Sequence, residues 1–260
     1  KSSVVLALLL PPYSTSVSTP KGTTNVTNPS PFDAPPINEP VADTPYLNEI
    51  YQTPININHS WPSGASYTGD WVNGVMHGKG TLIKQNGERY EGSFKNGVYE
   101  GNGILRLANG DRYKGSFKNG CYEGNGILRF ANGNSYEGSF KNGVPNGHGI
   151  SKMPNDHTYD GEWKNGMKDG LGTATSDTYE YKGYWKQNGK HGKGVVTFKN
   201  GERHEATWKD NKKHGYGFMT TLNGDKFKRY WKNGKKIGRE ILIKPTGNVY
   251  TGKLVDGVFE

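Results

Sequence analysis

The chain has 260 residues with 33 Lys and Arg against 24 Asp and Glu, and it combines 38 glycines with 12% aromatic residues and a single cysteine. The lone Cys121 excludes an intramolecular disulfide framework and any site that needs several cysteines. No Gly-X-Y period is present, so the glycine is not that of collagen. Aromatic residues at this frequency argue against a wholly disordered chain.

Residues 1–60 differ in composition from the rest, because they hold ten of the 14 prolines and one of the 38 glycines. The apolar run at residues 4–10 is shorter than the roughly 20 residues that span a bilayer, and it is a candidate remnant of a signal or anchor segment. The prolines favour extended coil. We therefore predict an extended N-terminal tail over residues 1–60 that is ordered by a partner or packed along the following residues.

From residue 61 onward the sequence repeats with a period of 23 residues. Tyr-x-Gly marks the start of a unit, and one step, from Tyr159 to Tyr181, is 22 residues. His204 and Phe227 replace the tyrosine in two units. The units start at Tyr67, Tyr90, Tyr113, Tyr136, Tyr159, Tyr181, His204, Phe227 and Tyr250.

Each unit has the pattern of two short strands and two turns. Residues 90–94 alternate between one face and the other, as in a half-buried strand. The Asn-Gly pair at 96–97 is strongly favoured in hairpin turns because both residue types tolerate positive φ. A second alternating stretch leads to another Asn-Gly pair at 109–110. The pattern predicts an all-β fold, an elongated twisted solenoid of about eight or nine stacked hairpins over residues 61–260.

Glycines at alternate positions leave one face of the sheet without side chains, so we expect a ring from a neighbouring unit to lie against bare backbone. Aromatic residues recur at two positions of the unit, and we expect them to form a continuous buried ladder. The predicted ladder consists of Tyr67, Trp71, Tyr90, Phe94, Tyr113, Phe117, Tyr136, Phe140, Tyr159, Trp163, Tyr181, Trp185, Trp208 and Trp231.

The stretch from residue 67 to residue 80, YTGDWVNGVMHGKG, resembles the MORN (membrane occupation and recognition nexus) repeat, whose pattern is Tyr-x-Gly-x-Trp-x-Asn-Gly-x-x-His-Gly-x-Gly. The resemblance covers residues 67–260. Ala206 and Arg229 depart from it by replacing the first glycine, and Glu240 replaces the last. We expect a lengthened turn and a shortened return strand around residues 187–192, and a final unit that ends after its turn.

The positive charge belongs to the repeats. Residues 1–60 contain two Lys and four Asp or Glu and so carry a net charge of −2. Because the whole chain carries +9, the net charge of residues 61–260 is +11. A lysine precedes the hairpin turn in most units, and these lysines are predicted to line one edge. They are Lys95, Lys118, Lys141, Lys164, Lys186, Lys209 and Lys232.

Three interpretations of this lysine edge remain open. The lysines are solvated and keep sheet edges apart, or they attract an acidic protein partner, or they bind anionic phospholipid headgroups. The last resembles the phosphoinositide contact often attributed to the MORN family. Nucleic acid is not expected as a partner, because the repeat places the rings inside the stack. A carbohydrate-binding solenoid would need exposed outer rings and is disfavoured for the same reason.

No catalytic pattern emerges from the sequence. The recurring Gly-x-Gly pairs precede strands rather than helices, so they are not phosphate loops. His77, His148, His191 and His214 lie one to a unit, and we expect neither a metal site nor a cofactor. We therefore predict that the chain is not an enzyme.

The favoured function is a structural scaffold or adaptor that presents an extended β-surface to other protein subunits of a larger complex. The resemblance implies cytoskeletal, ciliary or membrane-associated settings, and an intracellular location is favoured. A free strand near Phe259 is predicted to be unpaired and available for dimerisation.

Overall fold

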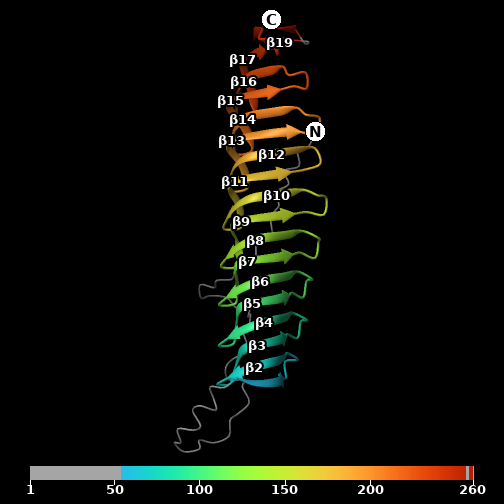
Figure 1. The fold of residues 1–260 in the computed structure, drawn as a ribbon, viewed down its shortest axis with the longest axis vertical. Helices are drawn as coiled ribbons and strands as arrows, with labels where there is room; N and C mark the ends of the chain where they lie inside the picture. Colours follow the sequence, from blue (N-terminus) through green and yellow to red (C-terminus); the bar gives the residue numbers. More distant parts are fainter. Residues whose placement is uncertain (1–53, 256–257, 260) are drawn as a thin grey trace, which may run out of the picture. The chain divides into compact units, whose positions relative to one another are not determined.

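The computed structural model describes residues 54–255 and 258–259. Residues 1–53 of the tail predicted over residues 1–60, with the apolar run, therefore lie outside the described residues. The described residues form twenty β-strands and no helix. Strands β1 to β18 belong to one open antiparallel sheet (Figure 1), which confirms the all-β prediction. No helix in the described ranges has the length and apolar character of a membrane span.

Contacts divide the chain into two compact units, with the boundary within β8 (Ser135–Lys141). The described residues of the N-terminal unit are 54–131 and 140–144, and the C-terminal unit has 132–139 and the described residues from 145 onward. The N-terminal unit contains β1 (Ile55–Ser60), β2 (Ser66–Val72), β3 (Val75–Ile83), β4 (Arg89–Lys95), β5 (Val98–Arg106), β6 (Arg112–Lys118) and β7 (Cys121–Arg129).

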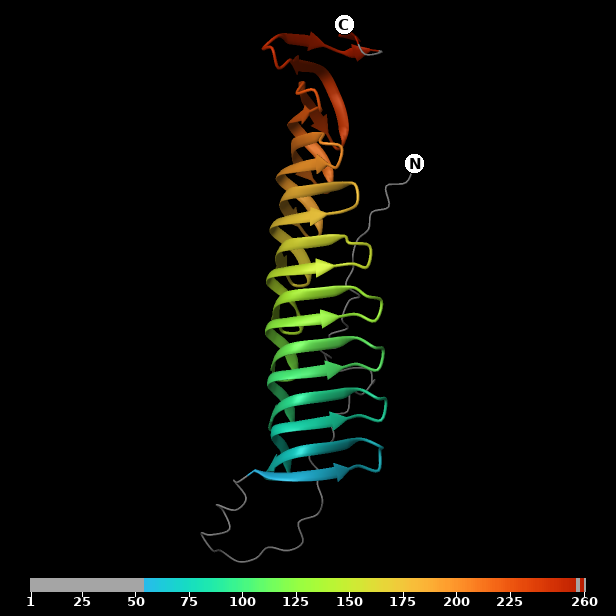
Figure 2. The same cartoon turned by 45° about the vertical axis from the view of Figure 1, so that its right-hand side comes forward.

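The C-terminal unit continues the same pattern after β8. Each strand from β9 to β17 pairs antiparallel with the next, as Figure 2 shows. Its strands are β9 (Val144–Lys152), β10 (Thr158–Lys164), β11 (Met167–Thr175), β12 (Tyr179–Lys186), β13 (Gly189–Phe198), β14 (Arg203–Lys209), β15 (Lys212–Thr220), β16 (Lys226–Lys232), β17 (Lys235–Ile243), β18 (Val249–Gly252), β19 (Leu254–Val255) and β20 (Val258–Phe259).

The first strand begins earlier than the sequence indicates. Residues 55–60, assigned above to the tail, form β1 and pair with all of β2 up to Trp71. Burial alternates only over the second part of β1, where Ile57 and His59 are half-buried and Asn58 and Ser60 are exposed, whereas Ile55 and Asn56 are both exposed. Backbone hydrogen bonds to β2 define this strand, so the boundary of the sheet moves to residue 55.

The hairpin turns have two residues with positive φ, as their sequences predict. In the turn after β4, Asn96 has φ 50° and Gly97 has φ 80°. The turn around residue 187 was expected to be longer, and this is wrong: Gln187 and Asn188 have φ 46° and 68°, and Lys186 pairs directly with Gly189. The missing residue lies instead in the loop at 176–178. There a 176-to-179 backbone hydrogen bond replaces the longer 107-to-111 bond of an ordinary unit.

The two glycines of each Gly-x-Gly pair serve different purposes. In β5, Gly101 has φ 65°, a left-handed conformation that glycine adopts without strain, and it faces the register shift in the hairpin partner. Gly103 instead leaves room for a ring, because a Cβ built on it would lie 2.5 Å from the Tyr90 hydroxyl. A Cβ on its neighbour Gly92 would also lie 2.5 Å from that oxygen.

The ring that covers the paired glycines comes from the same unit, which corrects the expectation of a neighbouring ring. Tyr90 lies over Gly92 and Gly103 of its own hairpin and donates a hydrogen bond to the Ser93 carbonyl at 2.8 Å. The same donation recurs at 2.8–3.0 Å in six of the seven units that start with tyrosine, namely those of Tyr67, Tyr90, Tyr113, Tyr136, Tyr159 and Tyr181.

Neighbouring units contact each other through the second aromatic position. Tyr90 forms T-shaped ring pairs with Phe94 of its own unit and Phe117 of the next, both with centroids 5.0 Å apart. Three of the tryptophans at this position also donate from the indole to a glycine carbonyl of the preceding unit: Trp163 to Gly149 at 3.0 Å, Trp185 to Gly172 at 3.1 Å and Trp208 to Gly194 at 3.3 Å. Of the fourteen ladder residues predicted above, thirteen are buried and Trp231 is half-buried.

The ladder changes character where tyrosine is absent. In the unit that starts at Phe227 there is no hydroxyl over the glycine positions, and Arg229 and Glu240 occupy them. The Arg229 Nε atom lies 2.5 Å from a carboxylate oxygen of Glu240, and Lys236 binds the other oxygen. Burial opposes ionisation of Glu240, but hydrogen bonds from Lys236 and Arg229 hold its pKa below the usual value.

Substitution of Gly126 by alanine tests the tyrosine–glycine contact. The added Cβ would lie 2.4 Å from the Tyr113 hydroxyl, so the G126A variant is expected to lose about 1–3 kcal/mol of unfolding free energy by overpacking. Chemical denaturation measures this loss. Ala206→Gly is the matched control, since the ring at its unit start is His204, and it should cost only about 0.5–1 kcal/mol. Equal effects of the two substitutions would contradict the contact.

Removal of the Trp163 side chain tests the ladder itself. Trp163 is 4% exposed and lies between Tyr136 and Tyr159, with ring centroids 5.2 Å from each. The W163A variant is expected to lose about 3–5 kcal/mol of stability. Tyr184, an exposed aromatic residue in the next unit, supplies the control, and Y184A should change stability by less than about 0.5 kcal/mol. Unchanged thermal unfolding of W163A would refute the ladder.

Candidate interaction surfaces

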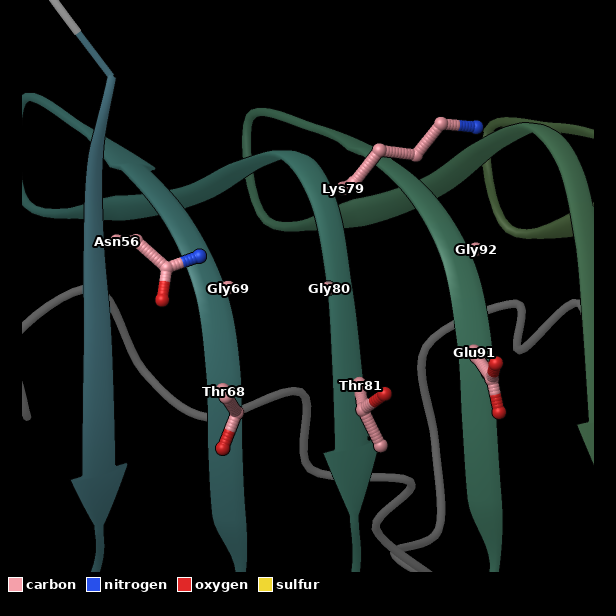
Figure 3. Close-up of a pocket in the computed structure, with 8 residues that line it drawn as sticks. All are labelled: Asn56, Thr68, Gly69, Lys79, Gly80, Thr81, Glu91 and Gly92. Carbon is pink, nitrogen blue, oxygen red and sulfur yellow. The ribbon is translucent and has the colours of Figure 1, made fainter.

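The buried rings occupy one side of the sheet, and side chains at the alternate positions face solvent. In the N-terminal unit an open pocket of about 430 Å³ lies on β1 to β4, with Gly69, Gly80 and Gly92 in its lining. Figure 3 shows the side chains of Thr68, Thr81 and Glu91 on neighbouring strands around it. Apart from the three glycines, the lining residues have polar side chains: Asn56, Thr68, Lys79, Thr81 and Glu91. The polar side chains of this hollow can form hydrogen bonds with a ligand such as a peptide segment. The carboxylate of Glu91 is already paired with Arg89 at 3.1 Å.

The seven turn lysines are all exposed, and each directly precedes a two-residue hairpin turn. Lys95, Lys118 and Lys141 belong to the N-terminal unit, and the other four belong to the C-terminal unit. Their exposure is compatible with solvation as well as with an anionic partner. Contact with acidic protein or phospholipid through these lysines therefore stays a prediction.

A second set of lysines escaped the sequence analysis. The second residue of the return strand is Met76, Tyr99 or Tyr122 in the N-terminal unit, where the two tyrosines stack on Tyr90 and Tyr113. In the C-terminal unit it is Pro145 in β9 and a lysine in β11, β13, β15 and β17. Lys168 Nζ lies 4.6 Å from the Tyr159 ring centroid, and Lys190 Nζ lies 4.8 Å from that of Tyr181. Alignment of the units places these lysines at an apolar position, and that is the signal that could have identified them.

Burial changes the ionisation of these groups. Desolvation lowers the pKa of Lys168 to about 8 and that of Lys190 to about 8, and Lys213 adds repulsion at Lys190. The contacts with the rings oppose this by favouring the cation. Burial also raises the pKa of the hydroxyls beneath the sheet, such as Tyr113 and Tyr181, well above the usual value, so these tyrosines remain neutral donors.

The histidines named above do not converge. His148 Nε2 lies 3.0 Å from the Asp160 carboxylate, and His191 Nδ1 lies 3.8 Å from the Asp210 carboxylate. Each of the two histidines thus has a different carboxylate neighbour. The Nδ1 atoms of His77, His191 and His214 are buried and accept or donate no hydrogen bond among the described residues. Within the described ranges no group of three His, Cys, Asp or Glu residues could hold a metal ion.

Exposed aromatic residues gather on β15 to β17 of the C-terminal unit. Tyr216 pairs in register with Tyr230, which in turn pairs with Ile237, and all three are exposed. The two tyrosine rings contact each other with centroids 4.9 Å apart, and Phe218 is exposed two residues along the same strand. We call Tyr216, Phe218, Tyr230 and Ile237 the outer aromatic patch. The sequence analysis, which placed the rings inside, missed it.

The C-terminal end differs from the prediction of an unpaired strand. Phe259 in β20 pairs with Leu254 in β19, so this strand has a partner within the chain. β18 pairs with β17 over Val249 to Gly252 and begins the last unit, as expected. Dimerisation through the terminal strands stays a prediction.

Comparison with known proteins agrees with the repeat pattern. A family model described as the MORN repeat matches seven consecutive segments, residues 67–89, 90–112, 113–135, 136–158, 159–179, 181–203 and 204–226. A search of curated proteins gives no match.

Solved structures resemble the chain at low sequence identity. The TCP10 domain of Danio rerio CPAP, in complex with a peptide of STIL, is 14% identical, with 76% of this chain and 84% of that chain covered and a TM-score of 0.44. The TCP domain of Drosophila melanogaster SAS-4, in complex with a proline-rich motif of Ana2, is 13% identical, covers 67% and 89%, and has a TM-score of 0.41. Likenesses at this level carry no argument about binding.

The pH dependence of stability tests the buried state of Lys168. Because its pKa is about 8 in the folded chain and about 10.4 when unfolded, the unfolded state binds more protons between these values, and stability should rise with pH in that window. In the K168M variant this rise should be smaller by roughly 1–3 kcal/mol. The exposed Lys186 provides the control, K186M, which should follow the unsubstituted protein. Identical pH profiles for all three proteins would contradict the assignment.

Proposed function

This chain belongs to the MORN repeat family, and from that premise we propose that it is a non-catalytic structural adaptor that presents its sheet surface to other protein subunits of a larger complex. The outer aromatic patch is the observation that carries the proposal. Soluble proteins rarely leave several large apolar side chains contiguous and exposed unless a partner covers them. Tyrosine is also enriched among the residues that dominate protein–protein binding.

The arrangement of the patch supports a protein partner. Tyr216, Tyr230 and Ile237 stand opposite one another on three consecutive strands, and backbone hydrogen bonds hold the strands in register. Lys228 Nζ lies 5.1 Å from the Tyr216 ring centroid and adds a charged rim. Apolar anchors with a polar rim on a backbone-defined surface are the features of a preorganised interface.

The non-catalytic part of the proposal rests on the structural partners of the side chains whose pKa departs from its ordinary value. Tyr113 and Tyr181, whose pKa burial raises, donate from their hydroxyls to backbone carbonyls, so they serve packing. Glu240, whose pKa is lowered, is saturated by Arg229 and Lys236. Perturbed groups that are explained by structural partners are weak candidates for chemistry. We propose an intracellular setting for the same adaptor role, in keeping with the family resemblance.

The alternative function is attachment to anionic phospholipid through the seven turn lysines. Their exposure favours it, since each cation near an anionic surface adds about 1 kcal/mol of attraction. Binding of this kind weakens steeply with salt. Flotation of the unsubstituted chain and of K95Q/K118Q with phosphoinositide-containing vesicles at two salt concentrations tests this alternative, and it requires weaker flotation of the variant.

Substitution of two patch residues tests the adaptor function. The Y216S/Y230S variant is expected to recover at least about tenfold less of its partner proteins when the tagged chain is purified from its native cells and quantified by mass spectrometry. Its thermal unfolding should match that of the unsubstituted chain, because both residues are exposed, at 64% and 37%. Leu222→Ser is the control, since Leu222 is exposed but lies in a loop outside the patch. Full recovery with the double variant would argue against the patch as an interface.

A further inference from the structure

Four arginines stand directly opposite one another on four consecutive strands of the N-terminal unit. Arg89 on β4 pairs in register with Arg106 on β5, Arg106 pairs with Arg112 on β6, and Arg112 pairs with Arg129 on β7. Neighbouring strands lie about 4.8 Å apart, so the four residues form a line roughly 14 Å long. We call this line the arginine row.

The row carries positive charge that the chain itself leaves largely unbalanced. Arg89 pairs with Glu91 at 3.1 Å, but no described residue makes an ion pair or hydrogen bond with the side chains of Arg106, Arg112 or Arg129. The Nε atom of Arg112 is buried without a hydrogen-bond partner. Like charges directly opposite in a sheet are destabilising, and an unpaired buried donor adds to that cost.

Acidic groups near the row are committed elsewhere. Asp111, beside Arg112, is 8% exposed and accepts hydrogen bonds from the Asn109 side chain and the Ala131 amide. Glu88, beside Arg89, is bound by Lys84 at 2.6 Å. The chain thus satisfies these two carboxylates locally and leaves the guanidinium groups for an external anion.

The neighbouring column of the same face is amphipathic. Two residues along each strand from the row lie Glu91, Ile104, Lys114 and Ile127, which also pair in register. Lys114 adds a fifth positive charge and Glu91 subtracts one, so the two columns together carry +4. Ile104 and Ile127 are half-buried and give the line of charge an apolar border.

We propose that the arginine row is the docking site for an extended, Asp- and Glu-rich segment of a partner protein, an inference that rests on the adaptor function and specifies one of its contacts. Guanidinium groups bind carboxylates in two-point contacts of defined geometry. An extended peptide rises about 3.4 Å per residue, so the first, third and fifth residues span about 14 Å, the length of the row. Three alternate carboxylates can therefore meet four guanidinium groups.

The single line of charge favours a peptide over a membrane. A lipid surface would meet the whole face at once, and there the exposed carboxylate of Glu91 would oppose it. The seven turn lysines lie at hairpin ends, outside the two columns. A linear ligand can follow the arginine row without contacting the neighbouring column, in which Glu91 lies paired with Arg89.

Binding of a labelled peptide to the full chain tests the proposal. The probe is a synthetic peptide of about ten residues in which Glu alternates with Thr, and fluorescence anisotropy measures its affinity; the matched peptide has Gln in place of Glu. We expect the Glu peptide to bind and the R106Q/R129Q variant to bind it at least about tenfold more weakly. K95Q/K118Q removes the same charge from exposed turns of the same unit and should retain the affinity. Arg106→Lys with Arg129→Lys should also weaken binding, because charge alone does not reproduce the two-point contact.

Two further measurements separate the alternatives. The thermal unfolding of R106Q/R129Q should be unchanged or raised, since the substitutions relieve repulsion between like charges. Flotation with phosphatidylcholine vesicles containing phosphoinositide, at two salt concentrations, asks whether lipid is the preferred anion. Binding to vesicles that R106Q/R129Q abolishes, without binding of the Glu peptide, overturns the proposal, as does equal affinity of the two peptides.

Failure of this inference would remain distinct from failure of the adaptor function. If the Glu peptide does not bind but R106Q/R129Q still recovers its native partner proteins and Y216S/Y230S loses them, the arginine row is no docking site and the adaptor function stands. Loss of the native partners in R106Q/R129Q together with loss of the peptide supports the row as a contact of the assembly.

Discussion

In each of the six units from Tyr67 to Tyr181, one ring lies across two glycines of its own hairpin, one on each strand, and its hydroxyl donates to a backbone carbonyl three residues on. A Cβ at either glycine would lie within van der Waals overlap of the ring, as Gly92 and Gly103 show with Tyr90 at 2.5 Å. The ring is therefore in direct contact with the backbone of both strands of its hairpin. The second aromatic position then joins one unit to the next through T-shaped pairs.

This constraint divides the two faces of the sheet by role. The inner face is committed to rings and glycines, so its residue types repeat with little variation. The residues on the opposite face have no such requirement. There the N-terminal compact unit carries the arginine row, and the C-terminal compact unit carries the outer aromatic patch. Where tyrosine is lost, the constraint relaxes, and Ala206, Arg229 and Glu240 enter positions that glycine holds elsewhere. There the Arg229 guanidinium pairs with Glu240 and lies 4.7 Å from the Phe227 ring centroid.

Much of the fold could be predicted because its signals are local. Two-residue turns follow from Asn-Gly pairs such as Asn96-Gly97, and the strand alternation follows from a period of two. The errors arose where local pattern is silent. β1 is defined by pairing with β2 rather than by its own alternation, and the missing residue of one unit was assigned to the turn at Gln187 although the loop at 176–178 absorbs it.

The sequence alone determined the repeat, its two-strand unit and the family, because spacing and turn chemistry are carried by neighbouring residues. Only the tertiary structure decided which ring covers which glycines, since partners there are set by strand register. Register also brought Arg89, Arg106, Arg112 and Arg129 into one line, although they are separated by six to seventeen residues between neighbours in the sheet. Likewise it placed Tyr216 beside Tyr230 at the surface. Pairing between strands converts positions scattered along the chain into continuous columns, and the surfaces proposed here are made of those columns.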